Sequence, residues 1–551
     1  MTRAITDQAR RMGLRPSCEV FGTLERRKAA KARQQIKKAH PKSRGSKEMA
    51  LYPRIARFRT VADLREHLAK INAPIPLDDS VLSAQAGSPL AAPIEIGGHR
   101  VGNRWCIHPM EGWDATPDGL PTEILLRRWR NFGLSGAKLI WGGEAVAVVP
   151  EGRANPNQLS AEACGRAGLA TLLETVRGAH RERYGSDDDL LVALQLTHSG
   201  RFSKPTAAGR QPRIAYHHPL LDARHQTPAA RTTAHGPSHT CVDPADSSCM
   251  LSDDDVERLI DRYVAVASDA AAAGFAMVDL KACHGYLVHE FLSARRRPGR
   301  FGGDFQGRTR LLCTLVKRVR AACPGLIIGV RLSLFDTVPW HRVGDHGEPW
   351  PWADAIPYDC GFGVNEADPT QMDLNEPIQL LRNLRDLGVA SVNLSAGSPY
   401  TVPHIQRPAA FAPSDGYPPP EDPLIGAWRQ IDAVRQAKAA VPDLVCVGTG
   451  YSYLQEYLVH AAQAVVRQDW ADVVGLGRMV LSYPDLPADS LTGQSLTRTK
   501  ICRTFSDCTT APRHGLRSGC YPLDDFYKSL QPDAAGMKAI KNSEHDALSN
   551  S

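Results

Sequence analysis

The sequence predicts an α/β fold, a (β/α)₈ or TIM barrel whose long loops cap the C-terminal face of the strands. Two observations lead to this prediction. Eight short apolar segments recur along the chain, and most are followed by a segment with the apolar spacing of a helix. Buried strands that alternate with helices form parallel sheets, and eight such units in one chain favour a closed barrel over an open sheet.

Length and composition fit one large domain with additions. The chain has 551 residues, of which 42% are hydrophobic, enough for a sizeable core. It contains no apolar run long enough to span a membrane and no apolar segment of a secretory signal at its start. Thirteen cysteines, an odd number, favour reduced thiols over a disulfide framework. We therefore expect a cytoplasmic protein that does not enter a membrane.

The positive charge of the chain is concentrated at its start. Residues 1–48 hold 14 basic and four acidic side chains, a net +10, whereas the whole chain carries +7 and the remaining 503 residues therefore −3. The body is not a basic nucleic-acid binder. We interpret residues 1–48 as a basic arm, disordered or partly helical, or as sequence upstream of a functional start at Met49. Contact between the arm and an anionic partner is the alternative.

Residues 49–91 are predicted to be an N-terminal extension in which residues 50–72 form a helix, and residues 92–500 to be the barrel. Ser252 should cap a helix that ends at Gly274, because acidic residues follow the serine and a glycine ends the pattern. The predicted strands are 103–110, 137–145, 190–196, 276–284, 326–333, 390–397, 444–450 and 471–478.

Three connections are unusually long: residues 197–251, 334–375 and 398–423. All three follow a strand, on the side of a barrel that carries the active site. Long loops are often functional. We interpret them as a lid over the barrel mouth, with a surface for a partner as the alternative.

Polar groups stand at the ends of the predicted strands, where the ends of a barrel face one another. The fourth strand delivers Lys281, His284 and Tyr286, which can all donate protons or hydrogen bonds. The third and fifth strands deliver Gln195 and Arg331. The seventh and eighth strands end in glycine-rich turns followed by an arginine, the usual barrel site for a phosphate group; its predicted residues are Gly450, Gly477 and Arg478.

The chain resembles the old yellow enzyme family of FMN-dependent NAD(P)H oxidoreductases, nearest to the bacterial branch that includes 2,4-dienoyl-CoA reductase and trimethylamine dehydrogenase. The resemblance covers about residues 92–485. It is carried by the stretches GNRWCIHPME, GGEAVAVVPEGR, QLTHSGR, KACHGYLVHEFLSA, RFGG, VRLS and VGLGR, each near a strand end.

The resemblance implies that FMN lies across the barrel mouth and accepts electrons from NADH or NADPH. Pro109, Met110 and Ala145 would line the flavin ring, Gln195 would bond its pyrimidine edge, and Arg331 would lie near its N1 atom. The phosphate would be held by the residues predicted above at the last two strands.

The activity implied is reduction of an activated C=C bond in a small-molecule substrate. His284 would bind the carbonyl oxygen of the substrate and Tyr286 would protonate its α-carbon. Two alternatives stay open. One is the reverse direction, oxidation or demethylation of an amine or desaturation of a carbonyl compound. The other is a non-catalytic barrel whose basic arm binds nucleic acid, although nucleic acid is not an expected partner.

Lys281 departs from the family pattern, which has histidine there. An ammonium group would favour an anionic substrate oxygen; alternatively Glu111 or Glu144 neutralises it in a structural ion pair. Glu111 also departs from the family, which has a small residue at that place, and an acid beside the flavin would lower its reduction potential.

Residues 501–551 are predicted to be a C-terminal extension and tail, without structure after about residue 535. Cys502, Cys508 and Cys520 lie there, where iron–sulfur relatives carry four cysteines. Phe505 stands in place of one ligand, so we expect neither an iron–sulfur cluster nor another metal. The chain ends too early for the C-terminal dinucleotide-binding domains of the larger relatives. The substrate, the preferred nicotinamide and the oligomeric state, a homo-oligomer included, stay open.

Overall fold

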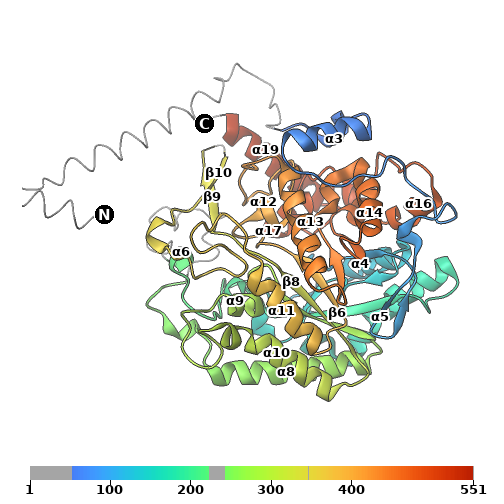
Figure 1. Cartoon of the computed structure of the whole chain (residues 1–551). Coiled ribbons are helices and arrows are strands. Elements are labelled where there is room, and N and C mark those ends of the chain that lie inside the picture. The colour runs from blue at the N-terminus through green and yellow to red at the C-terminus, as the bar shows by residue number, and fades with distance from the viewer. Residues whose placement is uncertain (1–51, 223–241, 345, 550–551) are drawn as a thin grey trace, which may run out of the picture. The chain divides into compact units, whose positions relative to one another are not determined.

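A closed parallel barrel forms the centre of the computed structural model (Figure 1). The structure describes residues 52–222, 242–344 and 346–549, so the predicted basic arm of residues 1–48 lies outside the described residues. The strands follow one another around the barrel in the order β4-β3-β13-β12-β11-β8-β7-β6, and β4 pairs with β6 to close it. The predicted fold class is therefore confirmed.

Each of the eight predicted strands is present. The second is interrupted into β4 and β5, which both pair with β6. The barrel strands are β3 (Trp105–Ile107), β4 (Leu139–Ile140), β5 (Ala145–Ala147), β6 (Leu191–Thr197), β7 (Met277–Ala282), β8 (Ile327–Ser333), β11 (Ser391–Ser395), β12 (Val445–Gly448) and β13 (Val473–Leu476).

The barrel strands are buried on both faces, which explains their continuous apolar runs. Their outward side chains pack against the surrounding helices, and their inward side chains fill the barrel near its N-terminal end. Gly329 shows how tightly that interior is filled, because a Cβ atom there would lie 2.3 Å from Met277 and 2.9 Å from Trp141. The hairpin of β1 (Ile94–Ile96) and β2 (His99–Val101) adds Ile96 and Val101 to the same cluster.

Helices follow the strands as the alternating pattern predicted. Ser252 caps α8 and exchanges hydrogen bonds with Asp255, and the helix ends just before Gly274. Helix α8 spans Asp253–Ala272, and the other α-helices between strands are α4 (Glu123–Leu134), α5 (Ala161–Tyr184), α6 (Pro219–Asp222), α9 (Leu287–Leu292), α10 (Phe305–Ala322), α11 (Asn375–Asp386), α12 (Pro403–Gln406), α13 (Pro423–Ala440) and α14 (Leu458–Arg467). None of the helices in the described ranges is both long and apolar enough to cross a membrane.

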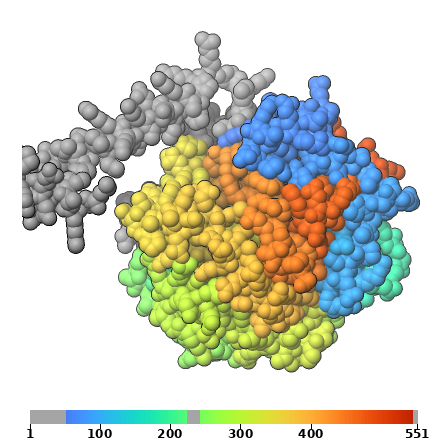
Figure 2. All heavy atoms as spheres, viewed as in Figure 1, coloured from blue at the N-terminus to red at the C-terminus, as the bar shows by residue number. Residues whose placement is uncertain are grey.

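The N-terminal segment packs on the outside of the barrel. Its helix α3 (Val61–Lys70) is shorter than the predicted helix over 50–72 and starts only at Val61, because Thr60 caps it in a capping box with Asp63. His67 on this helix pairs with Asp422, the residue that caps α13, at 2.8 Å. Figure 2 shows this blue segment against the orange and red parts of the chain that contain α13 and α14.

The connection after β8 and part of the C-terminal segment lie at the C-terminal ends of the strands. The connection after β8 forms the hairpin of β9 (Trp340–Val343) and β10 (His346–Pro349). Residues after β13 form α15 (Met479–Ser482), α16 (Leu486–Thr492), α17 (Asp507–Arg513), α18 (Asp525–Ser529) and α19 (Asp533–Ser549). The prediction of a tail without structure after residue 535 is therefore wrong for the backbone of α19.

Candidate active site

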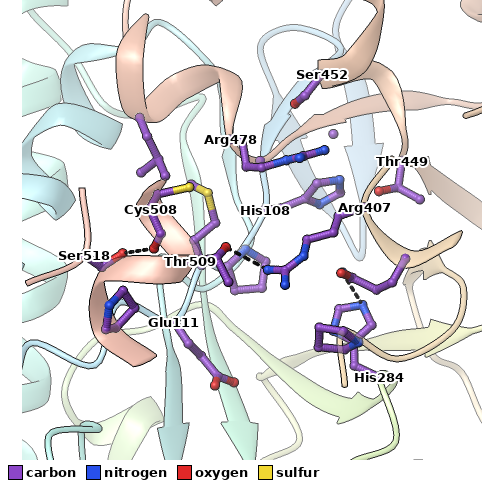
Figure 3. A pocket seen from close by; sticks show the side chains of 18 of the residues that line it. His108, Glu111, His284, Arg407, Thr449, Ser452, Arg478, Cys508, Thr509 and Ser518 are labelled. Atoms are coloured by element: carbon purple, nitrogen blue, oxygen red, sulfur yellow. Dashed lines mark hydrogen bonds between the residues drawn. The ribbon is translucent and has the colours of Figure 1, made fainter. Parts of the chain in front are cut away.

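A cavity of about 220 Å³ lies at the C-terminal ends of the barrel strands (Figure 3). Its wall combines the ends of β3, β7, β8, β12 and β13 with the loop after β11 and with α17. The predicted site residues that line it are Pro109, Met110, Lys281, His284, Tyr286, Arg331, Gly450, Gly477 and Arg478. Residues about 370 positions apart in the sequence therefore meet at one site, as the closure of a barrel requires.

Lys281 is held by Glu111 at the end of the first barrel strand. Their side chains form an ion pair and are 5% and 12% exposed. The other oxygen of Glu111 accepts a hydrogen bond of 2.7 Å from the Tyr286 hydroxyl, and the Lys281 ammonium lies 3.8 Å from the centre of the Tyr286 ring. Of the two partners that the sequence allowed for Lys281, the structure selects Glu111, because Glu144 pairs with Arg128 instead.

Burial and the negative charge of Glu111 raise the pKa of Tyr286 well above its ordinary value. The phenol therefore keeps its proton at neutral pH. The pairing also changes the expectation for Glu111. Since Lys281 neutralises the carboxylate, the pair has no net charge, and the argument that an isolated acid would lower a flavin potential does not apply to it.

His284 enters the cavity from a strained turn. Its φ is +64°, a conformation that few non-glycine residues adopt and that is concentrated at functional sites. The backbone N–H of His284 donates to the Ser333 hydroxyl at 3.0 Å, and its Nε2 lies 2.8 Å from the Ser395 hydroxyl. Burial, with the nearby charges of Arg331 and Lys281, lowers the pKa of His284 well below its ordinary value, so the imidazole is neutral.

The residues predicted for a flavin phosphate form an open cradle. Gly450 has a left-handed φ of +95°, and a Cβ atom on Gly477 would meet nothing closer than the Met110 sulfur at 3.9 Å. Arg478 donates from Nη2 to the Pro408 carbonyl at 2.6 Å, whereas its buried Nη1 has no partner among the described residues. Such an unused buried donor beside glycine backbone fits an anionic group.

Arg331, predicted to lie near the flavin ring, also has a guanidinium nitrogen without a hydrogen-bond partner among the described residues. Its Nη1 donates to the Pro109 carbonyl at 3.2 Å, and its buried Nε has no partner within the described chain. The unused donors of Arg331 and Arg478 thus fit the two electron-rich ends that FMN would present, its flavin ring and its phosphate.

Gln195 and Ala145 do not line the cavity. The amide nitrogen of Gln195 donates to Asp279, a fully buried carboxylate on β7 that also accepts from the backbone N–H of Arg331. Burial raises the pKa of Asp279 to about 6. Ala145 is buried in β5, where its carbonyl accepts from Gln158. The assignment of Gln195 and Ala145 to the flavin therefore stays a prediction.

A buried charge cluster supports the wall near the first strand. The Arg128 guanidinium pairs with Asp114 and with Glu144, and all three side chains are at most 4% exposed. The second oxygen of Glu144 accepts from the backbone N–H of Gly112 at 2.8 Å. Burial raises the pKa of Glu144, and the arginine charge opposes that rise. This cluster fixes the backbone next to Glu111.

Two further segments line the site: the sequence predicted the loop after β11 only as part of a lid over the barrel mouth, and it did not place the C-terminal extension there. The loop after β11 contributes Tyr400 and Arg407, and helix α17 of the C-terminal extension contributes Thr509 and Arg513. The signal was present as aromatic and arginine residues in a long loop and in a cysteine-containing extension. Their meeting was not predictable because neither segment belongs to the repeating strands and helices whose closure places the strand ends together.

The cysteines of the extension are free thiols. Burial raises the pKa of Cys502, Cys508 and Cys520, and Cys508 lines the cavity. Across residues 52–222, 242–344 and 346–549, no group of three histidine, cysteine or acidic side chains is arranged to hold a metal ion.

The cavity of this (β/α)₈ barrel is lined by an arginine from the fifth strand, an arginine after the last strand, and a histidine and a tyrosine after the fourth. This arrangement fits a flavin-dependent oxidoreductase. Residues 89–367 match the model of the NADH:flavin oxidoreductase / NADH oxidase family. The chain belongs to this family, which includes old yellow enzyme, and it is an FMN-dependent NAD(P)H oxidoreductase.

Curated relatives agree with this assignment. The chain is 24% identical to an NADH:flavin oxidoreductase of Gibberella zeae over 77% of its own length and 91% of that protein. It is 24% identical to an NADPH dehydrogenase of Halalkalibacterium halodurans over 63% of its own length and 77% of that protein.

Solved structures share the fold. One is the old yellow enzyme homologue of Zymomonas mobilis, with a TM-score of 0.50 and 23% identity over 76% of this chain and 96% of that one. Another is 2-naphthoyl-CoA reductase, with a TM-score of 0.57 and 15% identity over 81% of this chain and 58% of that one.

Proposed function

We propose that this oxidoreductase reduces a C=C bond conjugated to a carbonyl group in a small molecule, with NADH or NADPH as the electron donor. The observation that supports it best is that His284 and Tyr286 enter the same cavity as Arg331 and Arg478. A hydrogen-bond donor, a protonated phenol and an anion cradle are the groups that this reaction needs. Bound FMN would supply the hydride that reaches the β-carbon.

In this proposal Pro109 and Met110 contact the flavin ring, Arg331 lies at its electron-rich edge, and the cradle with Arg478 holds the phosphate. All of these residues line the one cavity. Arg331 and Arg478 each keep a buried guanidinium nitrogen without a hydrogen-bond partner among the described residues.

His284 would donate an N–H hydrogen bond to the carbonyl oxygen of the substrate. A neutral imidazole polarises the carbonyl and stabilises the enolate-like charge that develops when a hydride reaches the β-carbon. Its neutrality follows from burial and from the neighbouring cations. The Ser395 hydroxyl on its Nε2 and the Ser333 hydroxyl on its backbone fix the orientation of the ring.

Tyr286 would then transfer its phenolic proton to the α-carbon, which completes the addition of one hydride and one proton across the double bond. Glu111 holds the hydroxyl in place and keeps the phenol protonated until that step. Lys281 has a positioning role, because its charge neutralises Glu111 in a buried site. Solvent would return the proton to Tyr286 after product leaves.

The decisive experiment is an absorption spectrum of the purified protein, followed by anaerobic titration with NADH and NADPH and reoxidation by a panel of enones. A flavin spectrum that NAD(P)H bleaches and an enone restores supports the proposal. Bleaching by an amine or a saturated ketone, with no response to enones, would reverse the assigned direction. A colourless protein that takes up no FMN would remove the proposal altogether.

Tyr286→Phe tests the role of the phenol with a change of one atom. We expect flavin reduction by NAD(P)H at the wild-type rate and reoxidation by an enone slowed about 10²–10⁴-fold, the usual contribution of a positioned acid. Tyr400→Phe is the matched control, because its hydroxyl lies 3.4 Å from that of Tyr286 and has no assigned role in proton transfer. Equal loss in both half-reactions would exclude Tyr286 as the proton donor.

A further inference from the structure

The cavity has a large excess of positive charge. Six basic side chains line it, and the acidic side chain that faces them is Glu111. Three of the six have carboxylate partners, since Lys281 pairs with Glu111, Arg128 with Asp114 and Glu144, and Arg513 with Asp415. The other three, which have no ion-pair partner within the described residues, are Arg331, Arg407 and Arg478.

Two of these three cations already have an assignment. Arg331 and Arg478 lie at the predicted ring and phosphate ends of FMN. Arg407, at the end of α12, has none, and it lies beside Arg478 with its guanidinium turned toward Thr509 (Figure 3). Its buried Nε and Nη2 atoms have no hydrogen-bond partner among the described residues.

Arg407 is costly to the protein without an anion. Two nitrogen atoms of the partly buried Arg407 guanidinium are shielded from water, and its side-chain partner is a hydroxyl in place of a carboxylate. Burial and the positive charge of Arg478 lower the pKa of Arg407 to about 10, and burial with the charge of Arg407 lowers the pKa of Arg513 to about 9. The cluster is thus arranged to gain stability when an anion enters.

Thr509 completes the geometry. Its hydroxyl oxygen accepts a hydrogen bond of 2.7 Å from Nη1 of Arg407, so the hydroxyl proton stays available for another acceptor. The loop after β11 and the C-terminal extension are further joined by Ala410 N–H to Thr504 Oγ1 at 3.0 Å and by the Ser506 hydroxyl to the Phe411 carbonyl at 2.6 Å. These contacts fix Arg407 and Thr509 relative to each other.

We propose that Arg407 and Thr509 form an oxyanion-binding site in the flavin cavity. The ligand chemistry is a phosphate or carboxylate oxygen that accepts two guanidinium N–H bonds and one hydroxyl bond. Two sources carry that group. One source is the FMN phosphate, which carries two negative charges, of which Arg478 alone matches one. The other source is the carboxylate of an α,β-unsaturated acid as substrate, and this second possibility rests on the proposed function.

The test uses full-length Arg407→Gln, Arg407→Lys and Thr509→Val. The first removes the charge, the second keeps the charge without the planar fork, and the third removes the hydroxyl at constant shape. The control is the double variant Arg429→Gln/Glu421→Gln, which removes an ion pair outside the cavity lining and leaves the net charge unchanged.

The cofactor arm measures binding of FMN and of riboflavin to apoprotein by flavin fluorescence. If the source is the cofactor phosphate, Arg407→Gln weakens FMN binding at least tenfold and leaves riboflavin binding unchanged. Arg407→Lys and Thr509→Val change FMN binding in the same direction by less, and the ion-pair control stays at the wild-type value.

The substrate arm measures binding of cinnamate and of methyl cinnamate to FMN-loaded protein from the shift in flavin absorption. If the source is a substrate carboxylate, Arg407→Gln binds cinnamate at least tenfold more weakly, with methyl cinnamate and FMN unaffected.

Thermal melting of apoprotein separates binding from folding. Because Arg407 is a partly buried cation without a carboxylate partner among the described residues, apoprotein with Arg407→Gln should melt at or above the wild-type temperature, whereas a merely structural arginine would lower it. The anion site is overturned if Arg407→Gln matches wild type in both arms, or if it melts lower and binds both flavins equally less well. Wild-type protein that binds no FMN would instead refute the proposed function.

Discussion

Glu111→Gln is the substitution that tests the centre of the proposed mechanism. The change keeps the shape of the side chain and removes its charge. It leaves the Lys281 ammonium, 5% exposed, without a carboxylate, and it weakens the acceptor of the Tyr286 hydroxyl. Removing one partner of a buried ion pair costs about 3–5 kcal/mol of folding stability.

The catalytic effect follows from the hydrogen bond to Tyr286. A bond to a charged acceptor contributes about 1.5–3 kcal/mol. If that bond orients the phenol for proton transfer, its loss should slow reoxidation of the flavin by an enone by about 10- to 150-fold. Reduction by NAD(P)H should change less, because the phenol takes no part in it.

Stopped-flow absorption at the flavin band measures both half-reactions, and urea unfolding measures stability. The double variant Glu111→Gln/Lys281→Met is the control, because it removes both charges. It should regain most of the lost stability, since an apolar replacement of a buried pair is often neutral, yet reoxidation should stay slow. Wild-type stability and wild-type reoxidation in Glu111→Gln would refute both the ion pair and the anchoring of Tyr286.

Three further predictions concern the cradle, the charge cluster and acid stability. Arg478→Ala should reduce FMN retention on gel filtration but leave riboflavin binding intact; unchanged flavin content would contradict the phosphate assignment. Arg128→Met should lower the free energy of unfolding in urea by about 3–5 kcal/mol, because two carboxylates stay buried without their cation, whereas exposed Arg130→Met should change it by less than about 1 kcal/mol. Burial lowers the pKa of His404 to about 3 in the folded protein. On acidification the unfolded chain therefore binds a proton at this histidine before the folded protein does. The contribution of His404 to the free energy of unfolding is thus fully present above pH 6.5 and is lost as the pH falls toward 3. Between pH 5.5 and 4 the unfolding free energy of the wild type should therefore fall more steeply than that of His404→Gln, by about 1.4 kcal/mol per pH unit; equal slopes would contradict a neutral buried histidine.

Local signals predicted the barrel because each one lies within a single segment. A strand that is buried on both faces is apolar throughout. The capping residue Ser252 marks the start of α8 in the sequence. The elements that were shifted or split depend on neighbours. Helix α3 starts at its capping box, and the second strand is interrupted into β4 and β5, which pair with different parts of β6.

The sequence by itself determined the eight strands, their order and the residues at their ends, since the periodicity of buried side chains and the glycine-rich turns are local. It also determined that Lys281, His284, Tyr286, Arg331 and Arg478 face one cavity, because a closed parallel barrel leaves no other place for its strand ends.

Only the tertiary structure decided which partner each group takes. Lys281 pairs with Glu111, 170 positions away, and Gln195 turns to Asp279. Arg407 meets Thr509 from an extension beyond the barrel. These choices depend on distances of a few ångströms between separate segments, and the energy of a charge in a low-dielectric site depends on those distances and on burial. No pattern along one segment contains that information.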